Sequence, residues 1–218
     1  IYHLTESIGS TKTIKYIAET ATAPYVLLYT KYDTLKLGYH ALDRMLTIAS
    51  DHGALMLYAD HHTSLPTGER QAMPLIDYQL GSVRDDFQMG SLLLISTEGL
   101  KRYTAQENLH RYQFAALYDL RLFLSREKLP VHVQEFLYTE VETDTRLSGE
   151  KQFDYVDPKN RQVQIEMEKI CTDHLKRIGA WLPPVFKEVP FTSNLQDDGN
   201  PSGQSPTRNL FPVMASVI

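Results

Sequence analysis

Two apolar stretches decide the fold: YVLLY at residues 25–29 and ALMLYA at residues 54–59. Each is a short, continuous apolar run, which is typical of a strand buried on both faces of a sheet. Between them, the apolar residues of 39–51 recur at helical spacing, and Gly53 follows as a C-terminal cap. The stretch therefore predicts strand, helix, strand, the pattern of a parallel crossover.

The same alternation continues on both sides of this unit. Ser10 is a plausible N-cap for the helix that precedes the first strand. His132 alternates with two valines, so in a strand it faces away from them. We predict an α/β fold, a three-layer sandwich with a mainly parallel sheet. Its further elements are helices at Ile14–Ala21, His110–Ser125 and Lys159–Ile178, and strands at Ser91–Ile95, Val131–Val133 and Glu135–Tyr138.

Composition limits the classes of protein that remain. The chain has 218 residues, a formal net charge of −5 and 42% hydrophobic residues, which is ordinary globular composition. Lys and Arg do not form a basic stripe of the kind that would indicate a nucleic-acid partner. No apolar run is long enough for a transmembrane segment. The single Cys171 excludes an intrachain disulfide. Without a recognisable signal peptide, the cytoplasm is the expected location.

Polar groups at the ends of the predicted strands are the candidate chemistry, because ligands of open parallel sheets bind there. Lys31 and Asp33 follow the first strand, and Asp60 opens the run Asp60-His61-His62 after the second. Carboxylate and imidazole together can bind a divalent cation. Adjacent side chains alternate in direction, so a polar loop with one inward Asp is the alternative.

A third polar cluster lies before the strand at residues 91–95. It consists of Arg84, Asp85 and Asp86. The cluster is either part of a binding site or a surface ion-pair network. Motifs that would decide the chemistry at once, such as GxGxxG, GxxxxGK[ST], GxSxG and HExxH, do not occur in the chain.

Five segments in order resemble the inverting family-two glycosyltransferases. APYVLLYTKYDTLKLG (23–38) resembles their metal-site segment, and GALMLYADHH (53–62) their next strand. RDDFQMGSLLLISTEGL (84–100) resembles the acceptor-side segment, and FAALYDLRLFLS (114–125) the helix that carries the catalytic base. VHVQEFLYTEVETDTRLSG (131–149) is similar to the closing strand and tail. Together the order and spacing point to this family.

The resemblance implies a glycosyltransferase A fold that lacks part of the nucleotide-binding front half. It implies transfer of a sugar from a nucleotide-sugar donor to a saccharide or lipid-linked acceptor, as in polysaccharide biosynthesis. A divalent metal, Mg²⁺ or Mn²⁺, would neutralise the leaving diphosphate. The implied roles are catalytic base for Asp119, donor binding for Lys31, Asp33 and Asp60, metal binding for Asp33 and Asp60, and acceptor binding for Arg84, Asp85 and Asp86.

The chain also departs from the family pattern. The two metal-binding Asp positions fall at Thr30 and Tyr32, which are poor ligands for Mg²⁺ or Mn²⁺. The acidic pair of the catalytic helix becomes Tyr118-Asp119. Two hypotheses follow: a sugar-transferring enzyme, or a catalytically silent glycosyltransferase-like accessory domain that binds acceptor or packs on a neighbouring catalytic domain.

The end of the chain differs in composition from the rest. Residues 1–192 are expected to form the α/β domain, with a long polar loop at 142–155. Residues 193–210 are rich in Gly, Pro and Asn and are predicted to be a linker. The apolar run at 211–218 is predicted to open a covalently linked following domain.

Overall fold

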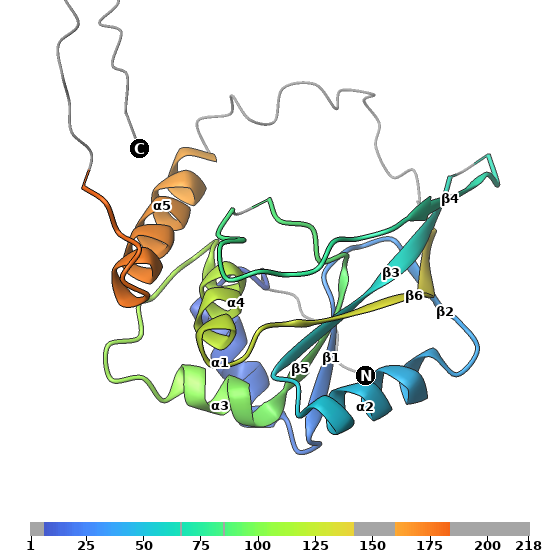
Figure 1. Cartoon of the computed structure of the whole chain (residues 1–218), viewed down its shortest axis with the longest axis horizontal. Helices are drawn as coiled ribbons and strands as arrows, with labels where there is room; N and C mark the ends of the chain where they lie inside the picture. Colours follow the sequence, from blue (N-terminus) through green and yellow to red (C-terminus); the bar gives the residue numbers. More distant parts are fainter. Residues whose placement is uncertain (1–6, 66, 85, 142–159, 184–218) are drawn as a thin grey trace, which may run out of the picture.

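A six-stranded mixed sheet lies at the centre of the molecule, with helices on both of its faces (Figure 1). The structure, a computed structural model, describes residues 7–65, 67–84, 86–141 and 160–183. The helices are α1 (Thr11–Thr20), α2 (Ala41–His52), α3 (Thr97–Thr104), α4 (Ala116–Glu127) and α5 (Asn160–Arg177). The strands are β1 (Tyr25–Tyr29), β2 (Thr34–Leu37), β3 (Met56–Ser64), β4 (Arg70–Met73), β5 (Leu92–Ser96) and β6 (Val131–Val141).

The strand order is β1-β5-β3-β6-β2, with β4 paired to the end of β3. The three apolar strands of the prediction therefore do share one sheet. Their pairing differs from the prediction of a mainly parallel sheet: β3 and β6 are parallel, whereas β1–β5, β5–β3, β3–β4 and β6–β2 are antiparallel. The sheet is mixed.

The reversed direction of β5 has a physical cause in its connection. A parallel connection needs a crossover, usually a helix. The chain instead leaves β3 through the β4 hairpin, and residues 74–91 contain no helix in the part that the structure describes. β5 thus returns antiparallel to β3 and separates it from β1. A continuous apolar run indicates that a strand is covered on both faces, but it does not indicate the direction of the strand.

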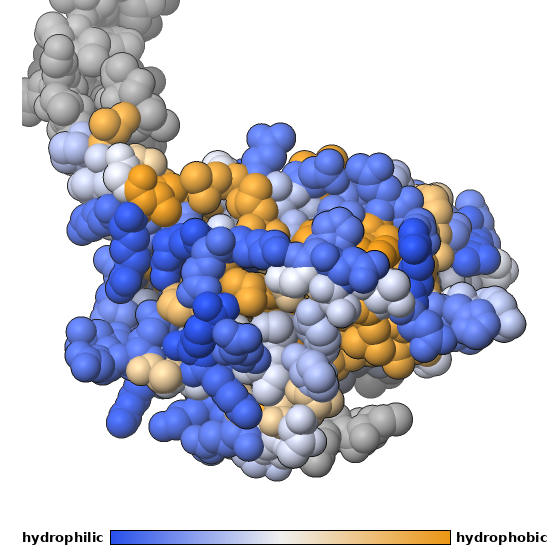
Figure 2. Space-filling model, turned by 60° about the horizontal axis from the view of Figure 1, so that its bottom comes forward, coloured by the Kyte–Doolittle hydropathy of each residue, from blue (hydrophilic) through white to orange (hydrophobic). Residues whose placement is uncertain are grey.

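The two faces of the sheet carry separate cores. On one face α1, α3 and α4 pack over β1, β3 and β5 around Ile14, Tyr58 and Leu120. On the other face α2 packs through Met45 against residues such as Leu57. α2 leaves two of its leucines more than a third exposed, and the face in Figure 2 shows apolar patches between hydrophilic side chains.

The predicted caps of two helices are confirmed. Ser10 accepts a hydrogen bond from the Thr13 amide at 3.1 Å at the start of α1. Gly53 ends α2 with a φ of 52°, a left-handed conformation that glycine adopts without steric cost. The two short strands predicted at 131–133 and 135–138 are one longer strand, β6, which continues to Val141.

The helix predicted at His110–Ser125 begins later, at Ala116. The preceding residues are held in tertiary hydrogen bonds instead. The Tyr112 amide donates to the Thr11 hydroxyl at 2.9 Å, and the Thr11 amide donates to the Tyr112 carbonyl at 2.9 Å. The backbone of this segment is therefore bonded to the start of α1 and cannot also form the first turn of α4.

A carboxylate of α5 binds the backbone that leads into α4. Glu166 accepts hydrogen bonds from the amides of Gln113 at 2.9 Å, Phe114 at 2.9 Å and Ala115 at 3.0 Å. A negative charge at this end of a helix also interacts favourably with the helix dipole. Together with the buried Ile170, this contact fixes α5 on α4.

Several predictions concern residues outside the described part of the chain. These are Asp85, the polar loop at 142–155, the linker at 193–210 and the apolar run at 211–218. The boundaries of the domain at 1–192 stay a prediction for the same reason. None of the described helices has the length and apolar character needed to cross a membrane.

We expect Glu166→Ala to lower the free energy of unfolding by about 1–2 kcal/mol, because three backbone donors lose a charged acceptor. Urea denaturation followed by circular dichroism measures this. Glu168→Ala, on the exposed side of the same helix, is the matched control and should change stability by less than about 0.5 kcal/mol. Equal effects of the two substitutions would contradict the role of Glu166.

Candidate functional site

A cleft of 1020 Å³ lies at the carboxyl ends of β1, β3 and β6, which run in the same direction. It is the place where the sequence predicts ligand binding. We call it the Lys31–Glu140 cleft. Its lining consists of Thr30, Lys31, His61, Thr63, Leu65, Gln71, Met73, Pro74, Leu75, Ile76, Gly81, Ser82, Arg84, Asp86, Phe87, Gln88, Gly90, Ser91 and Glu140.

A buried carboxylate forms the floor of this cleft. Glu140 of β6 is 1% exposed, and its two oxygens accept from the Lys31 ammonium and the Ser91 hydroxyl. His61 Nε2 of β3 lies 3.5 Å from the oxygen that Ser91 contacts. A carboxylate at this depth needs such partners, because an unpaired buried charge is strongly unfavourable. Burial, followed by the charge of Glu140, raises the pKa of Tyr29 to about 12.

His61 is packed into the wall beside this carboxylate. Its ring stacks on Tyr138 at 4.9 Å between centroids, and the Tyr138 hydroxyl accepts from the Ser91 amide at 3.1 Å. Burial lowers the pKa of His61, while Glu140 opposes this shift. The Nδ1 atom is buried without a hydrogen-bond partner among the described residues.

Gly90 makes this packing possible. Its φ is 68°, and a Cβ atom placed there would lie 2.2 Å from the Tyr138 hydroxyl and 3.4 Å from His61 Nδ1. Only a residue without a side chain allows the backbone to pass so close to these two rings. The Gly90-Ser91 pair before β5 thus brings the chain against the floor of the cleft.

An ion pair lies at the rim of the cleft. Arg84 Nε donates to Asp86 at 2.8 Å, and the two side chains are 79% and 56% exposed. Arg84 and Asp86 thus form a surface ion pair and also line the cleft, so the binding-site interpretation of the cluster stays open. The buried Arg121 of α4 donates to the carbonyl of Arg84, which holds the rim segment in place.

Asp60, expected to bind donor and metal, has other partners. Its buried carboxylate accepts from the Leu75 amide at 2.8 Å and lies 2.8 Å from His132 Nε2. Asp33 is half-buried between β1 and β2, and neither Asp lines the cleft. Among the described residues, no group of three or more His, Cys, Asp or Glu side chains could hold a metal ion. The metal site stays a prediction.

Thr30 and Tyr32 occupy the two positions that carry metal ligands in the family pattern. The Thr30 hydroxyl donates to the Ser91 carbonyl at 3.2 Å, so it helps join β1 to β5. Tyr32 is fully exposed. Neither side chain supplies the carboxylate oxygen that a hard cation prefers.

Asp119, the expected base, lies away from the cleft. Its carboxylate accepts from the Tyr103 hydroxyl at 2.9 Å, and it lines a cavity of 20 Å³ together with His110, Arg126 and residues of α5. Burial raises the pKa of Asp119, against the hydrogen bond from Tyr103. The structure brings Lys31, Arg84 and Asp86 together but does not place Asp119 beside them.

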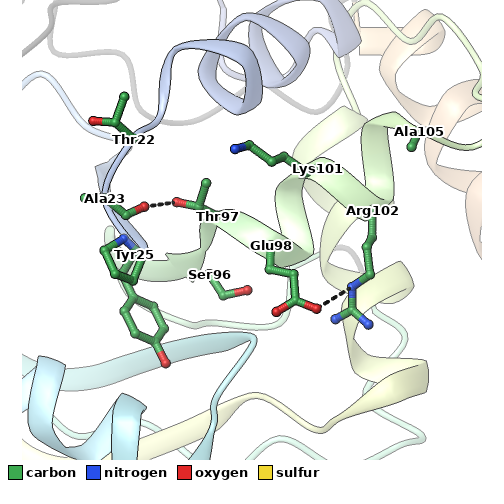
Figure 3. A pocket seen from close by; sticks show the side chains of 10 residues that line it. Thr22, Ala23, Tyr25, Ser96, Thr97, Glu98, Lys101, Arg102 and Ala105 are labelled. Carbon is green, nitrogen blue, oxygen red and sulfur yellow. Dashed lines mark hydrogen bonds and ion pairs between the residues drawn. The ribbon is translucent and has the colours of Figure 1, made fainter.

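A second hollow, of 740 Å³, lies at the opposite end of β1 (Figure 3). Thr97 donates to the Ala23 carbonyl there at 2.6 Å, and Arg102 pairs with Glu98 at 3.8 Å. Arg102 also contacts Glu127 at 2.7 Å. No residue predicted to be functional lines this hollow, whereas Lys31, Arg84 and Asp86 all line the Lys31–Glu140 cleft.

Comparison of the sequence with protein-family models finds no match. Comparison with curated proteins finds no significant match.

Glu140, the residue at the centre of the site, is not among the residues that the sequence predicts to be functional. The predicted strand ends at Tyr138, so Glu140 falls in the region after it. Residues two apart in a strand share a face, so extending the strand would have placed Glu140 beside the buried Tyr138. Ser91 was recognised only as the start of a strand.

We expect the free energy of unfolding to decrease as the pH falls through about 6.5, the ordinary pKa of an unfolded histidine. Burial lowers the pKa of His61 in the folded state, so the unfolded chain binds this proton more readily. Urea denaturation between pH 7.5 and 5 measures the slope. His61→Gln should flatten it, whereas His52→Gln at the exposed end of α2 should not. Identical slopes in the two variants would contradict this assignment.

Proposed function

We propose that this chain is a family-two glycosyltransferase-like domain that binds a saccharide in the Lys31–Glu140 cleft and does not itself catalyse transfer. The observation that carries the proposal is the pairing of charge in the cleft. Lys31 is paired with Glu140, and Arg84 is paired with Asp86. Among the described lining residues these are the charged groups, and His61 has a lowered pKa. The site therefore suits an uncharged polar ligand.

The lining of the cleft includes both apolar and polar side chains. Leu75, Ile76 and Phe87 supply apolar surface, while Gln71 and Gln88 supply polar groups. A pyranose ring has an apolar C–H face and a rim of hydroxyl groups, so it can use both kinds of wall. The volume of 1020 Å³ is at the upper end of ordinary ligand sites and can take more than one sugar ring.

A nucleotide-sugar donor suits this cleft less well. Its diphosphate needs a counter-charge, which a divalent metal usually supplies. Thr30 and Tyr32 replace the carboxylates of the family pattern, and the ammonium of Lys31 is already paired with a buried carboxylate. Binding of acceptor is therefore favoured over binding of donor.

Transfer by this domain is the second candidate function. In it, the cleft would take a nucleotide sugar and a saccharide or lipid-linked acceptor. The observation that favours it is that Lys31 and Arg84 both line the cleft and are 48% and 79% exposed, so two cations can approach a diphosphate. A covalently linked downstream domain would be the alternative place for catalysis.

Titrations followed by amide NMR test the two functions. Neutral oligosaccharides of hexoses should shift the resonances of Gln88, Gly90 and Ser91, whereas uridine diphosphate sugars with Mn²⁺ should not. Ile76→Asn should weaken saccharide binding about tenfold, because Ile76 is 69% exposed and its apolar surface is worth roughly 1.5 kcal/mol. Ile165→Asn, a 55% exposed isoleucine of α5, is the matched control.

Two results would overturn the proposal. Saturable, Mn²⁺-dependent binding of a nucleotide sugar that is lost in Asp33→Ala or Asp60→Ala would favour the transferase. Absence of binding by every saccharide of the panel would contradict a saccharide site in the cleft.

A further inference from the structure

His132 of β6 lies between two carboxylates outside the cleft. Its Nε2 atom is 2.8 Å from Asp60 Oδ1 of β3, and its Nδ1 atom is 2.7 Å from Asp77 Oδ1. The side chains of His132 and Asp60 are 3% and 8% exposed, whereas that of Asp77 is 65% exposed. The ring of His132 stacks on Tyr58 with an interplanar angle of 5°. One imidazole thus joins the interior of the sheet to a residue at the surface.

The segment that this bridge reaches is the apolar wall of the cleft. Leu75 and Ile76 line the cleft and directly precede Asp77. The Leu75 amide donates to Asp60 at 2.8 Å, and the Tyr58 hydroxyl donates to the Ile76 carbonyl at 2.6 Å. Three consecutive residues without regular secondary structure are therefore hydrogen-bonded to polar side chains of the sheet, and Leu75 also packs against the core.

The charges around the bridge favour these contacts. Hydrogen bonds from His132, and then from Gln134, lower the pKa of Asp77, so Asp77 is an ionised acceptor. Burial raises the pKa of Tyr58 above its ordinary value, which keeps its hydroxyl as a donor to Ile76. Hydrogen bonds to an ionised carboxylate are stronger than those between neutral groups.

We propose that His132 is a positioning residue for the Lys31–Glu140 cleft, joining Asp60 to Asp77 and so fixing Leu75 and Ile76 as its apolar wall. The effect of His132 on saccharide binding rests on the proposed function. Its role in holding Leu75 and Ile76 in place does not rest on the proposed function. Because Asp77 is exposed, its contact with His132 can be removed without opening a cavity in the core.

Amide hydrogen exchange of Leu75, followed by NMR, tests the bridge directly. We expect Asp77→Ala to speed this exchange about tenfold or more, and Asp77→Asn, which keeps an acceptor for His132, to restore slow exchange to within about threefold of the parent chain. Glu135→Ala is the matched control, because Glu135 is an exposed carboxylate on β6 that pairs with Arg44. It should leave Leu75 unchanged.

Two further measurements separate positioning from general stability. The free energy of unfolding from urea denaturation should be similar in Asp77→Ala and Glu135→Ala. His132→Phe keeps an aromatic ring on Tyr58 but removes both nitrogens, and it should speed Leu75 exchange as Asp77→Ala does. If His132→Phe does not fold, the two Asp77 variants decide the question.

The outcomes distinguish this proposal from the proposed function. Leu75 exchange in Asp77→Ala equal to that of the parent chain, or equally fast in Asp77→Ala and Asp77→Asn, would overturn the bridge. If neutral oligosaccharides bind, Asp77→Ala should weaken them about tenfold and Asp77→Asn should restore binding. If no saccharide binds the parent chain, the proposed function fails, while the exchange data still decide the bridge.

Discussion

The carboxylate of Glu140 is the contact on which the functional end of the sheet depends. Glu140 lies on β6 and is only 1% exposed. Its carboxylate contacts Lys31, which follows β1, Ser91, which precedes β5, and His61 of β3. Four strands that are distant in sequence are thus joined through one charged group. A buried carboxylate is costly unless it is paired and hydrogen-bonded, so these four residues have to be placed together.

This contact also explains the polarity of the cleft. The positive charge of Lys31 is paired with Glu140, and that of Arg84 is paired with Asp86. The rest of the lining consists of hydroxyl and amide groups together with apolar side chains. The antiparallel β5 is essential to this arrangement, because its direction puts Gly90 and Ser91 at the same edge as the carboxyl ends of β1, β3 and β6. A parallel strand in that position would have put the other end of β5 there.

Polar side chains fix the irregular segments of the molecule in the same way. Glu166 holds the chain before α4, and Asp60 with His132 holds the segment after β4. In both places, backbone groups that secondary structure leaves unpaired are bonded to an ionisable side chain from elsewhere in the chain. Two acidic residues with predicted site roles are engaged in such internal contacts: Asp60, expected to bind donor and metal, and Asp119, the expected base.

The sequence by itself determined the local elements. YVLLY, ALMLYA and SLLLI predicted three strands of one sheet, and Ser10 and Gly53 predicted where two helices begin and end, because burial period and capping are local properties. It also indicated Lys31, Arg84 and Asp86 as candidate site residues. Only the tertiary structure decided the direction of β5, the late start of α4, the role of Glu140 and the separation of Asp119 from the cleft. Each of these depends on hydrogen bonds between residues far apart in the chain, and neither hydrophobic period nor propensity records such pairings.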